Sequence, residues 1–443
     1  GDFVVPRVNH QEFLQTPPLH YWVLGFWLRI AGVEPDGLAR MPSVAASVGT
    51  LLLTVLLARR HVGERAAFLS GAVLATMIGF WDTGHRVIVD TSLTFFTTLC
   101  LVQLARIELD GDLSLRRGAL LGAAAGLAFL TKGFVGPVIV GIVALVTLLR
   151  RPALRTPGAI RPAAAACAAF LLVALPWVIA LVRRDPGFAT ELLFAHVKRR
   201  ALEGSSHNPS NFTFIHRSLL MLLPAAALLP ILVAAAIRGR RGGTPAPSRS
   251  RRLNGLLLAW IAVPVILLLV SRSKRNLYLL PVFPAVAVLL GTWLDGVLER
   301  FRHRPRLPRV FETAAWSLLV IVPVAGTLYR VAEGPERSLR GIGSVLARLE
   351  AEGSPVVGYL LEEREQGAIA WYLRHPFEEI DDAAALKDRL AGRDGAVALV
   401  GDADALAAAA AGGADIARAR VVFEKKLRRR RLEVLQVSHG EED

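Results

Sequence analysis

Cysteine and dense metal-binding motifs are scarce in this 443-residue sequence. The two cysteines, Cys100 and Cys167, fall inside apolar runs. We expect them to be small buried side chains, and they indicate nothing about the redox compartment. No pair of histidines has a metal-ligand spacing such as His-Glu-x-x-His, so no metal motif is present and a divalent metal is left open as a cofactor.

Two other features are missing. The chain begins Gly1-Asp2-Phe3 with neither an initiator methionine nor a signal peptide, so we expect a further segment upstream. The sequence also has no internal self-similarity, which disfavours the inverted repeats of many transporters.

Apolar residues dominate the composition of the sequence. They make up 53% of the chain, the mean hydropathy is +0.44, and apolar runs of roughly 17 to 24 residues are separated by short basic loops. This pattern is typical of a polytopic α-helical membrane protein. The net charge of +15 comes mainly from loop residues, so membrane topology and lipid headgroups explain it and no nucleic-acid partner is expected.

Candidate spans begin after residue 41, and the length rule gives ten. We expect them at 42–58, 66–84, 89–109, 118–131, 133–149, 162–182, 213–237, 253–271, 277–296 and 311–331. The five basic loops between them alternate correctly if all lie in the cytoplasm. Residues 1–41, 82–90, 183–212, 271–276 and everything after 332 then face outward, and the protein is expected in the plasma (inner) membrane.

A proline-rich and aromatic stretch precedes these spans. Pro17 and Pro18 remove backbone donors, and His20 and Tyr21 follow them directly. We expect a rigid rim at the water–membrane boundary, followed by a short interfacial helix over 18–33.

Several outward segments carry cations against the topology trend. Such cations beside membrane-dipping segments suggest an anionic ligand, for example a phosphate at headgroup depth. The candidates are Arg199, Arg200, His207, Arg217, Lys274 and Arg275, with Tyr278 at the lipid–water boundary and Lys132 between two apolar runs. Interfacial anchoring explains the same residues without a ligand.

Asp90 opens an apolar run and is the candidate for acid–base chemistry. A carboxylate there could cap the helix, or it could face a polar cavity, bind a metal or orient Arg86.

Composition changes to charged and alanine-rich near residue 333. Strands are expected at 356–361, 396–400, 421–423 and 432–437, and helices at 363–373 and 383–390. We therefore divide the chain into an external loop with the interfacial helix (1–41), a transmembrane helical domain (42–332) and a small outward α/β domain (333–443).

These segments, in this order, resemble the ArnT-like, PMT-related family of integral-membrane GT-C glycosyltransferases. The resemblance rests on residues 1–7 and 16–22, Arg40-Met41-Pro42-Ser43, Arg86 to Asp90, Phe129 to Gly133 and Ser273 to Pro281. In that family the first acidic motif lies upstream of these segments. Many aminoarabinose transferases have Glu-Lys before Pro-Pro, where this chain has Gln15-Thr16, so the resemblance does not imply aminoarabinose specificity.

The resemblance implies a mainly α, GT-C type bundle that transfers a sugar from a polyprenyl-phosphate carrier, with inversion, to a lipid, glycan or protein acceptor on the outer face of the membrane. Asp90 would be catalytic, Lys274, Arg275 and Tyr278 would hold the carrier phosphate, and the proline rim would lie where lipid and acceptor meet. Two alternatives remain at this point, a transporter or flippase of an anionic lipid-linked substrate and a non-catalytic membrane scaffold.

Overall fold

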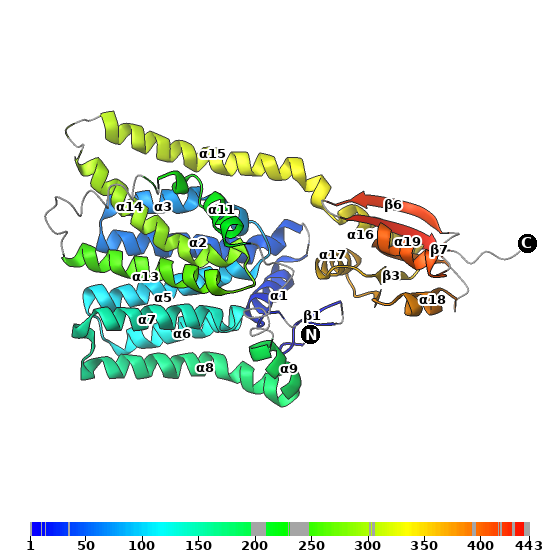
Figure 1. The fold of residues 1–443 in the computed structure, drawn as a ribbon, viewed down its shortest axis with the longest axis horizontal. Coiled ribbons are helices and arrows are strands. Elements are labelled where there is room, and N and C mark those ends of the chain that lie inside the picture. Colours follow the sequence, from blue (N-terminus) through cyan, green and yellow to red (C-terminus); the bar gives the residue numbers. More distant parts are fainter. Residues whose placement is uncertain are drawn as a thin grey trace, which may run out of the picture. The chain divides into compact units, whose positions relative to one another are not determined.

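The computed structural model divides the chain into two units (Figure 1). The first contains Gly1–Val5 and Leu14–Gly326, and the second contains Pro6–Phe13 and Thr327–Asp443. The structure describes residues 2–437 except 10, 14, 34–35, 196–209, 229, 231–247, 301–302, 304–305, 392–395, 415, 417–418 and 428–429.

The first unit is helical, and its long helices run side by side (Figure 1). They are α1 (Leu19–Ala31), η1 (Asp36–Arg40), α2 (Met41–His61), α3 (Glu64–Thr76), α4 (Ile78–Gly84), α5 (Val89–Asp110), α6 (Leu115–Lys132), α7 (Val135–Arg150), η2 (Pro152–Leu154), η3 (Pro157–Ala159), α8 (Ile160–Arg184), α9 (Pro186–Thr190), η4 (Glu191–Ala195), α11 (Asn211–Met221), η6 (Ala225–Leu228), α13 (Ser248–Val270), η7 (Asn276–Val282) and α14 (Phe283–Arg300). The division between the units falls within α15 (Arg306–Arg337).

Among the described residues, six helices are long and apolar enough to cross a membrane, or seven if the bent pair α3 and α4 is one span. This confirms a polytopic membrane bundle. The short α1 is not among them. Its Phe26 and Ile30 are 70% and 67% exposed, as suits a helix that lies in the interface.

Two of the predicted spans are not single straight helices. The run 66–84 is not one helix, because the chain bends by 67° at Met77 and the N–H of Ile78 donates to the carbonyl of Leu223 instead of to its own helix. The described part of the run 213–237 is also broken, since α11 ends at Met221; residues 229 and 231–237 lie outside the described residues. Backbone groups freed inside an apolar bundle need such partners from other segments, and hydropathy cannot reveal them.

Close packing fixes the helices that carry the site. A Cβ atom at Gly122 of α6 would lie 1.9 Å from the carbonyl oxygen of Ala166 on α8, so only glycine allows these backbones to approach this closely. Trp260 of α13 is fully buried, and its indole N–H donates to the carbonyl of Pro281 in η7 at 2.9 Å. The first contact packs α6 against α8, and the second holds the η7 turn against α13.

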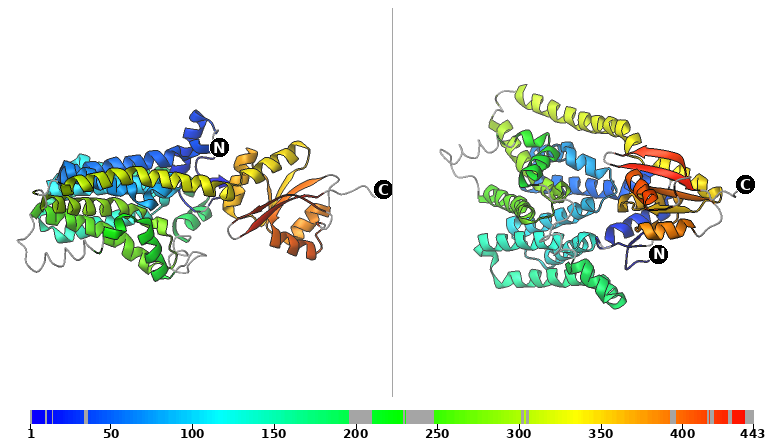
Figure 2. Two further views of the ribbon diagram at one scale, coloured as in Figure 1. Left: turned by 90° about the horizontal axis from the view of Figure 1, so that it is seen from above. Right: turned by 45° about the vertical axis from the view of Figure 1, so that its right-hand side comes forward.

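The second unit is a sheet covered by helices on both faces (Figure 2). Its strands are β3 (Val356–Tyr359), β4 (Glu378–Ile380), β5 (Val397–Asp402), β6 (Arg420–Lys426) and β7 (Arg431–Val437), in the order β4-β3-β5-β7-β6. The strands β4, β3 and β5 are parallel, and β7 and β6 continue the sheet antiparallel. The central β3 and β5 are buried on both faces, as parallel strands between helices require.

The helices of this unit are α16 (Arg340–Ala351), α17 (Glu363–Leu373), α18 (Ala383–Ala391) and α19 (Ala403–Ala411). The N-terminal hairpin of β1 (Arg7–Val8) and β2 (Gln11–Glu12) belongs to the same unit, and the Asn9 side chain accepts a hydrogen bond from the N–H of Phe377 at 2.8 Å. The sequence placed this hairpin with the external loop, because a contact between residues so far apart leaves no local pattern.

Glu379 is a half-buried acid in this sheet. One carboxyl oxygen accepts from the N–H of Leu361 at 3.0 Å, whereas the other is buried without a hydrogen-bond partner among the described residues. Burial raises the pKa of Glu379 to about 7.

We expect the second unit to lose stability as pH rises from about 4.5 to 7, because the unfolded chain releases this proton more readily than the fold does. Glu379→Gln should remove that pH dependence. At pH 8 it should raise the free energy of unfolding of the second unit by about 1–2 kcal/mol. The protection of the β3 amides against hydrogen exchange measures this free energy, once the rates are corrected for the effect of pH on exchange from the unfolded chain. Asp388→Asn, on an exposed part of α18, is the matched control, and equal slopes in wild type and Glu379→Gln would contradict the assignment.

Candidate functional site

Asp90 and Lys132 form a largely buried ion pair. Asp90 lies in the first turn of α5 and Lys132 is the last residue of α6, and these neighbouring helices are antiparallel, so the two side chains meet at one end of the bundle. Lys132 Nζ lies 2.5 Å from Asp90 Oδ1, and the side chains are 12% and 9% exposed. Burying either charge alone would cost free energy, and the attraction between the two groups offsets that cost.

Tyr278 completes a group of three with this pair. It lies in η7, which the Trp260 hydrogen bond holds in place. Lys132 Nζ lies 4.0 Å from the centroid of its ring, within the range of a cation–π contact. Three segments far apart in the sequence therefore bring together a carboxylate, a cation and an aromatic face.

The proline rim lies beside the start of α5. Pro17 and Pro18 are buried, Thr16 Oγ1 and the Tyr21 hydroxyl are 3.2 Å apart, and α1 begins directly after Pro18. His20 is 2% exposed, and its Nδ1 lies 3.0 Å from Ser92 Oγ.

His20 is held in its neutral form. Burial lowers the pKa of His20 to about 4, against the opposing attraction of Asp90. Its Nε2 is buried and has no hydrogen-bond partner among the residues that the structure describes. The sequence predicted this histidine as a rim residue, and the structure ties it to the first turn of α5.

Lys274 is anchored away from water. It is 7% exposed, and its ammonium group donates to the Asn211 side-chain oxygen at the start of α11. In the same segment the Asn276 amide donates at 2.8 Å to the Phe214 carbonyl and to Ser218 Oγ. These bonds fasten the Lys-x-x-x-Tyr segment to α11.

The remaining predicted residues differ in placement. Arg275 and Arg217 are exposed. Arg86 pairs with Asp82 at 2.6 Å, whereas the sequence suggested Asp90 as its partner. The i,i+4 spacing on one helix end favours Asp82. Arg199, Arg200 and His207 lie outside the described residues.

Sequence reasoning missed Ser92, Asn211 and Asn276. Each is a neutral polar residue that positions a predicted one, by the contacts to His20, to Lys274 and to α11 given above. A polar residue in the first turn of an apolar helix, as Ser92 is, was a usable signal. Among the described residues no three His, Cys, Asp or Glu side chains gather closely enough to hold a metal ion.

Comparisons with known proteins show what the chain is similar to. The family model described as dolichyl-phosphate-mannose-protein mannosyltransferase matches residues 15–179. The undecaprenyl phosphate-alpha-4-amino-4-deoxy-L-arabinose arabinosyl transferase of Aeromonas salmonicida is 28% identical over 71% of this chain and 56% of the relative. Its counterpart in Pseudomonas aeruginosa is 29% identical over 68% and 53%. The chain thus spans about half the length of the curated relatives it matches.

Solved structures define the fold. ArnT from Cupriavidus metallidurans bound to undecaprenyl phosphate superimposes with a TM-score of 0.79 over 100% of this chain and 92% of that one, at 21% identity. The chain therefore has the GT-C fold of ArnT. The oligosaccharyltransferase AglB from Archaeoglobus fulgidus is a more distant match, with a TM-score of 0.51 at 12% identity over 90% and 63% of the two chains. The predicted family resemblance and fold class are confirmed.

A double-mutant cycle tests the ion pair of this ArnT-like chain. Lys132→Met leaves the Asp90 carboxylate without its partner and should cost about 3–5 kcal/mol of stability. Adding Asp90→Asn should recover part of that loss, with a coupling of roughly 1–3 kcal/mol. Thermal unfolding of the detergent-solubilised protein measures Lys132→Met, Asp90→Asn and the double variant, and additive losses would mean that the two groups do not interact.

Proposed function

We propose that the chain is a membrane glycosyltransferase that moves a sugar from a polyprenyl-phosphate carrier to an acceptor, with inversion at the anomeric carbon. The observation that supports it most is the Asp90–Lys132–Tyr278 group, which places a candidate base beside a cation at one end of the spans. That end would be the outer, periplasmic face, and the second unit would lie on the same side.

The proposed reaction needs one base and one anion site. The Asp90 carboxylate accepts the proton of the acceptor's hydroxyl or amino group as that group attacks the anomeric carbon. The bond between this carbon and the phosphate oxygen breaks, and its electron pair leaves with the polyprenyl phosphate. Positive charge near the departing phosphate lowers the barrier, and the more so where water is excluded.

Lys132 connects the two requirements. Lys132 neutralises Asp90, and a carrier phosphate that contacts the same ammonium group would weaken that ion pair. Binding of the phosphate would then release the carboxylate to act as a base when the donor is in place. Tyr278 holds the ammonium group from its other side, and Lys274 and Arg275, in the same segment, would contact the phosphate next.

The relatives support the same class of donor. Those cited above carry the name of transferases for an undecaprenyl-phosphate-linked sugar, and the ArnT structure holds undecaprenyl phosphate. By this proposal the donor of the present chain is likewise a sugar on a polyprenyl phosphate, and the acceptor is a lipid, glycan or protein at the membrane surface.

Sugar transfer from a radiolabelled polyprenyl-phosphate sugar tests the proposal. Asp90→Asn should lower transfer by about 10²–10⁴-fold because the base is lost, with a small change in carrier binding. Asp112→Asn is the matched control at the other end of α5, where the carboxylate pairs with Arg117, and it should keep wild-type activity. Carrier binding without cleavage, unchanged by Asp90→Asn, would contradict catalysis and favour the lipid transporter.

Tyr278 offers a finer test. Tyr278→Phe keeps the aromatic face over Lys132 and should retain most of the activity, whereas Tyr278→Leu removes a contact of about 0.5–2 kcal/mol and should lower kcat/KM roughly 2- to 30-fold. Steady-state kinetics on both variants provides the measurement. If Phe and Leu are equally impaired, the hydroxyl group and not the ring is the important part of Tyr278.

A further inference from the structure

A second cluster of charged residues lies at the opposite end of the bundle from Asp90. Arg106 lies 16 residues after Asp90 on α5, which is about 24 Å along the helix axis at 1.5 Å per residue. Asp110, at the end of α5, accepts hydrogen bonds from Arg60 of α2 at 2.8 Å and from Arg249 of α13 at 2.9 Å. Arg106 lies 3.8 Å from the same carboxylate.

Positive charge is in excess in this cluster. Three guanidinium groups surround the single carboxylate of Asp110, which neutralises one of them. Arg60 and Arg106 are still 47% and 26% exposed, so an outside anion can reach them. An arginine fork binds phosphate oxygens well, because its N–H groups match their geometry.

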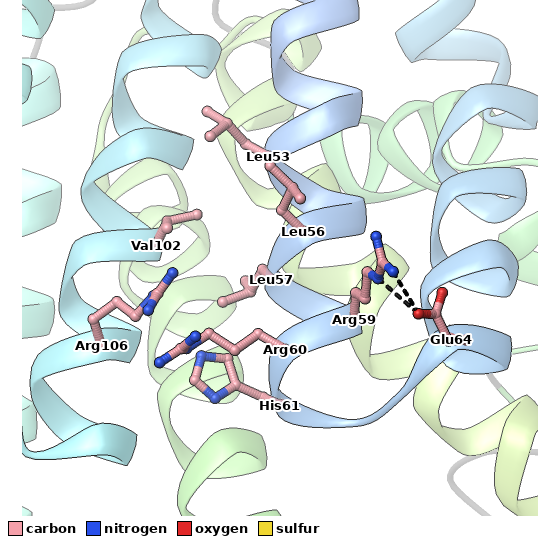
Figure 3. A pocket seen from close by; sticks show the side chains of 9 residues that line it. All are labelled: Leu53, Leu56, Leu57, Arg59, Arg60, His61, Glu64, Val102 and Arg106. Carbon is pink, nitrogen blue, oxygen red and sulfur yellow. Dashed lines mark hydrogen bonds and ion pairs between the residues drawn. The ribbon is translucent and has the colours of Figure 1, made fainter.

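A cavity of about 500 Å³ opens beside these arginines (Figure 3). Arg60 and Arg106 extend towards each other from α2 and α5, whereas Arg59 turns to Glu64 on α3 and pairs with it at 2.7 Å. Four apolar side chains line it further along the two helices, Leu53, Leu56, Leu57 and Val102, and His61 and Glu64 lie with the arginines at its charged end. The cavity is therefore cationic at one end and apolar along its length.

The sequence spacing aligns the apolar side chains with the cations. Leu56 and Leu53 precede Arg60 by about one and two helical turns, and Val102 precedes Arg106 by one turn. Both helices run from these arginines back towards the middle of the membrane, so the apolar lining lies at acyl-chain depth. Leu56 is 55% exposed at the surface of the bundle, so the groove is open to lipid.

We propose that this cavity is a binding site for an anionic phospholipid of the leaflet opposite the Asp90 site. Its phosphate lies between Arg60 and Arg106, and one acyl chain lies along Leu53, Leu56 and Val102. Basic pockets between transmembrane helices bind anionic headgroups in this way. A bound lipid would join the ends of α2 and α5, and this site is independent of the proposed transfer reaction.

Native mass spectrometry of the detergent-solubilised full chain tests the site, with phosphatidylglycerol and phosphatidylcholine as the probes. Wild type should bind phosphatidylglycerol at least ten-fold more tightly than phosphatidylcholine. The double variant Arg60→Gln/Arg106→Gln should bind phosphatidylglycerol roughly 25-fold more weakly, about five-fold for each charge removed. Equal affinity for the two lipids in wild type would overturn the proposal.

Two further variants separate a built site from a charged surface. Arg116→Gln removes an exposed cation from the start of α6 and should leave phosphatidylglycerol binding within two-fold of wild type. Val102→Trp keeps every charge but fills the apolar lining, and it should also reduce binding at least ten-fold. Full binding by the folded Val102→Trp protein, or competition by millimolar inorganic phosphate, would overturn the lipid site in favour of a simple phosphate site.

Discussion

A buried ion pair in an apolar bundle is the constraint on which the rest of the site depends. An isolated charge in such a setting costs several kcal/mol even after relaxation, so Asp90 and Lys132 are tolerable only where they meet. Their meeting requires that α5 begins and α6 ends at the same face of the bundle. The glycine contact between α6 and α8 and the Trp260 bond to η7 fix the lysine and the tyrosine ring that flank the carboxylate.

Two polar residues of the candidate site have neutral partners in the described part of the chain. His20 is neutral and linked to Ser92, and Lys274 is fixed to Asn211. Lys132 and Lys274 can therefore attract an anion, because the partners described for them are one carboxylate, an aromatic ring and an amide. The distribution suits a ligand that brings its own negative charge, as a carrier phosphate does.

The sequence predicted the elements better than the contacts between them. The length of the apolar runs predicted the helical bundle. The α/β tail was predicted because β3, β5 and α17 have strong local patterns, and the predicted helix 363–373 matches α17. Asp90, Lys132 and Tyr278 were each named, but their meeting depends on helix packing, which no local pattern encodes. The bend at Met77 and the place of the N-terminal hairpin were missed for the same reason, since their partners are Leu223 and Phe377.

The two ends of the bundle make different use of positive charge. At one end Lys132 faces a carboxylate and a ring, and at the other Arg60 and Arg106 share Asp110 beside an apolar cavity. The most direct test of the account is an electron cryomicroscopy structure of the protein with undecaprenyl phosphate. We expect phosphate density in contact with Lys132, and a Lys132–Asp90 distance longer than 2.5 Å. Phosphate density only between Arg60 and Arg106, with the Lys132–Asp90 contact intact, would contradict the proposed site.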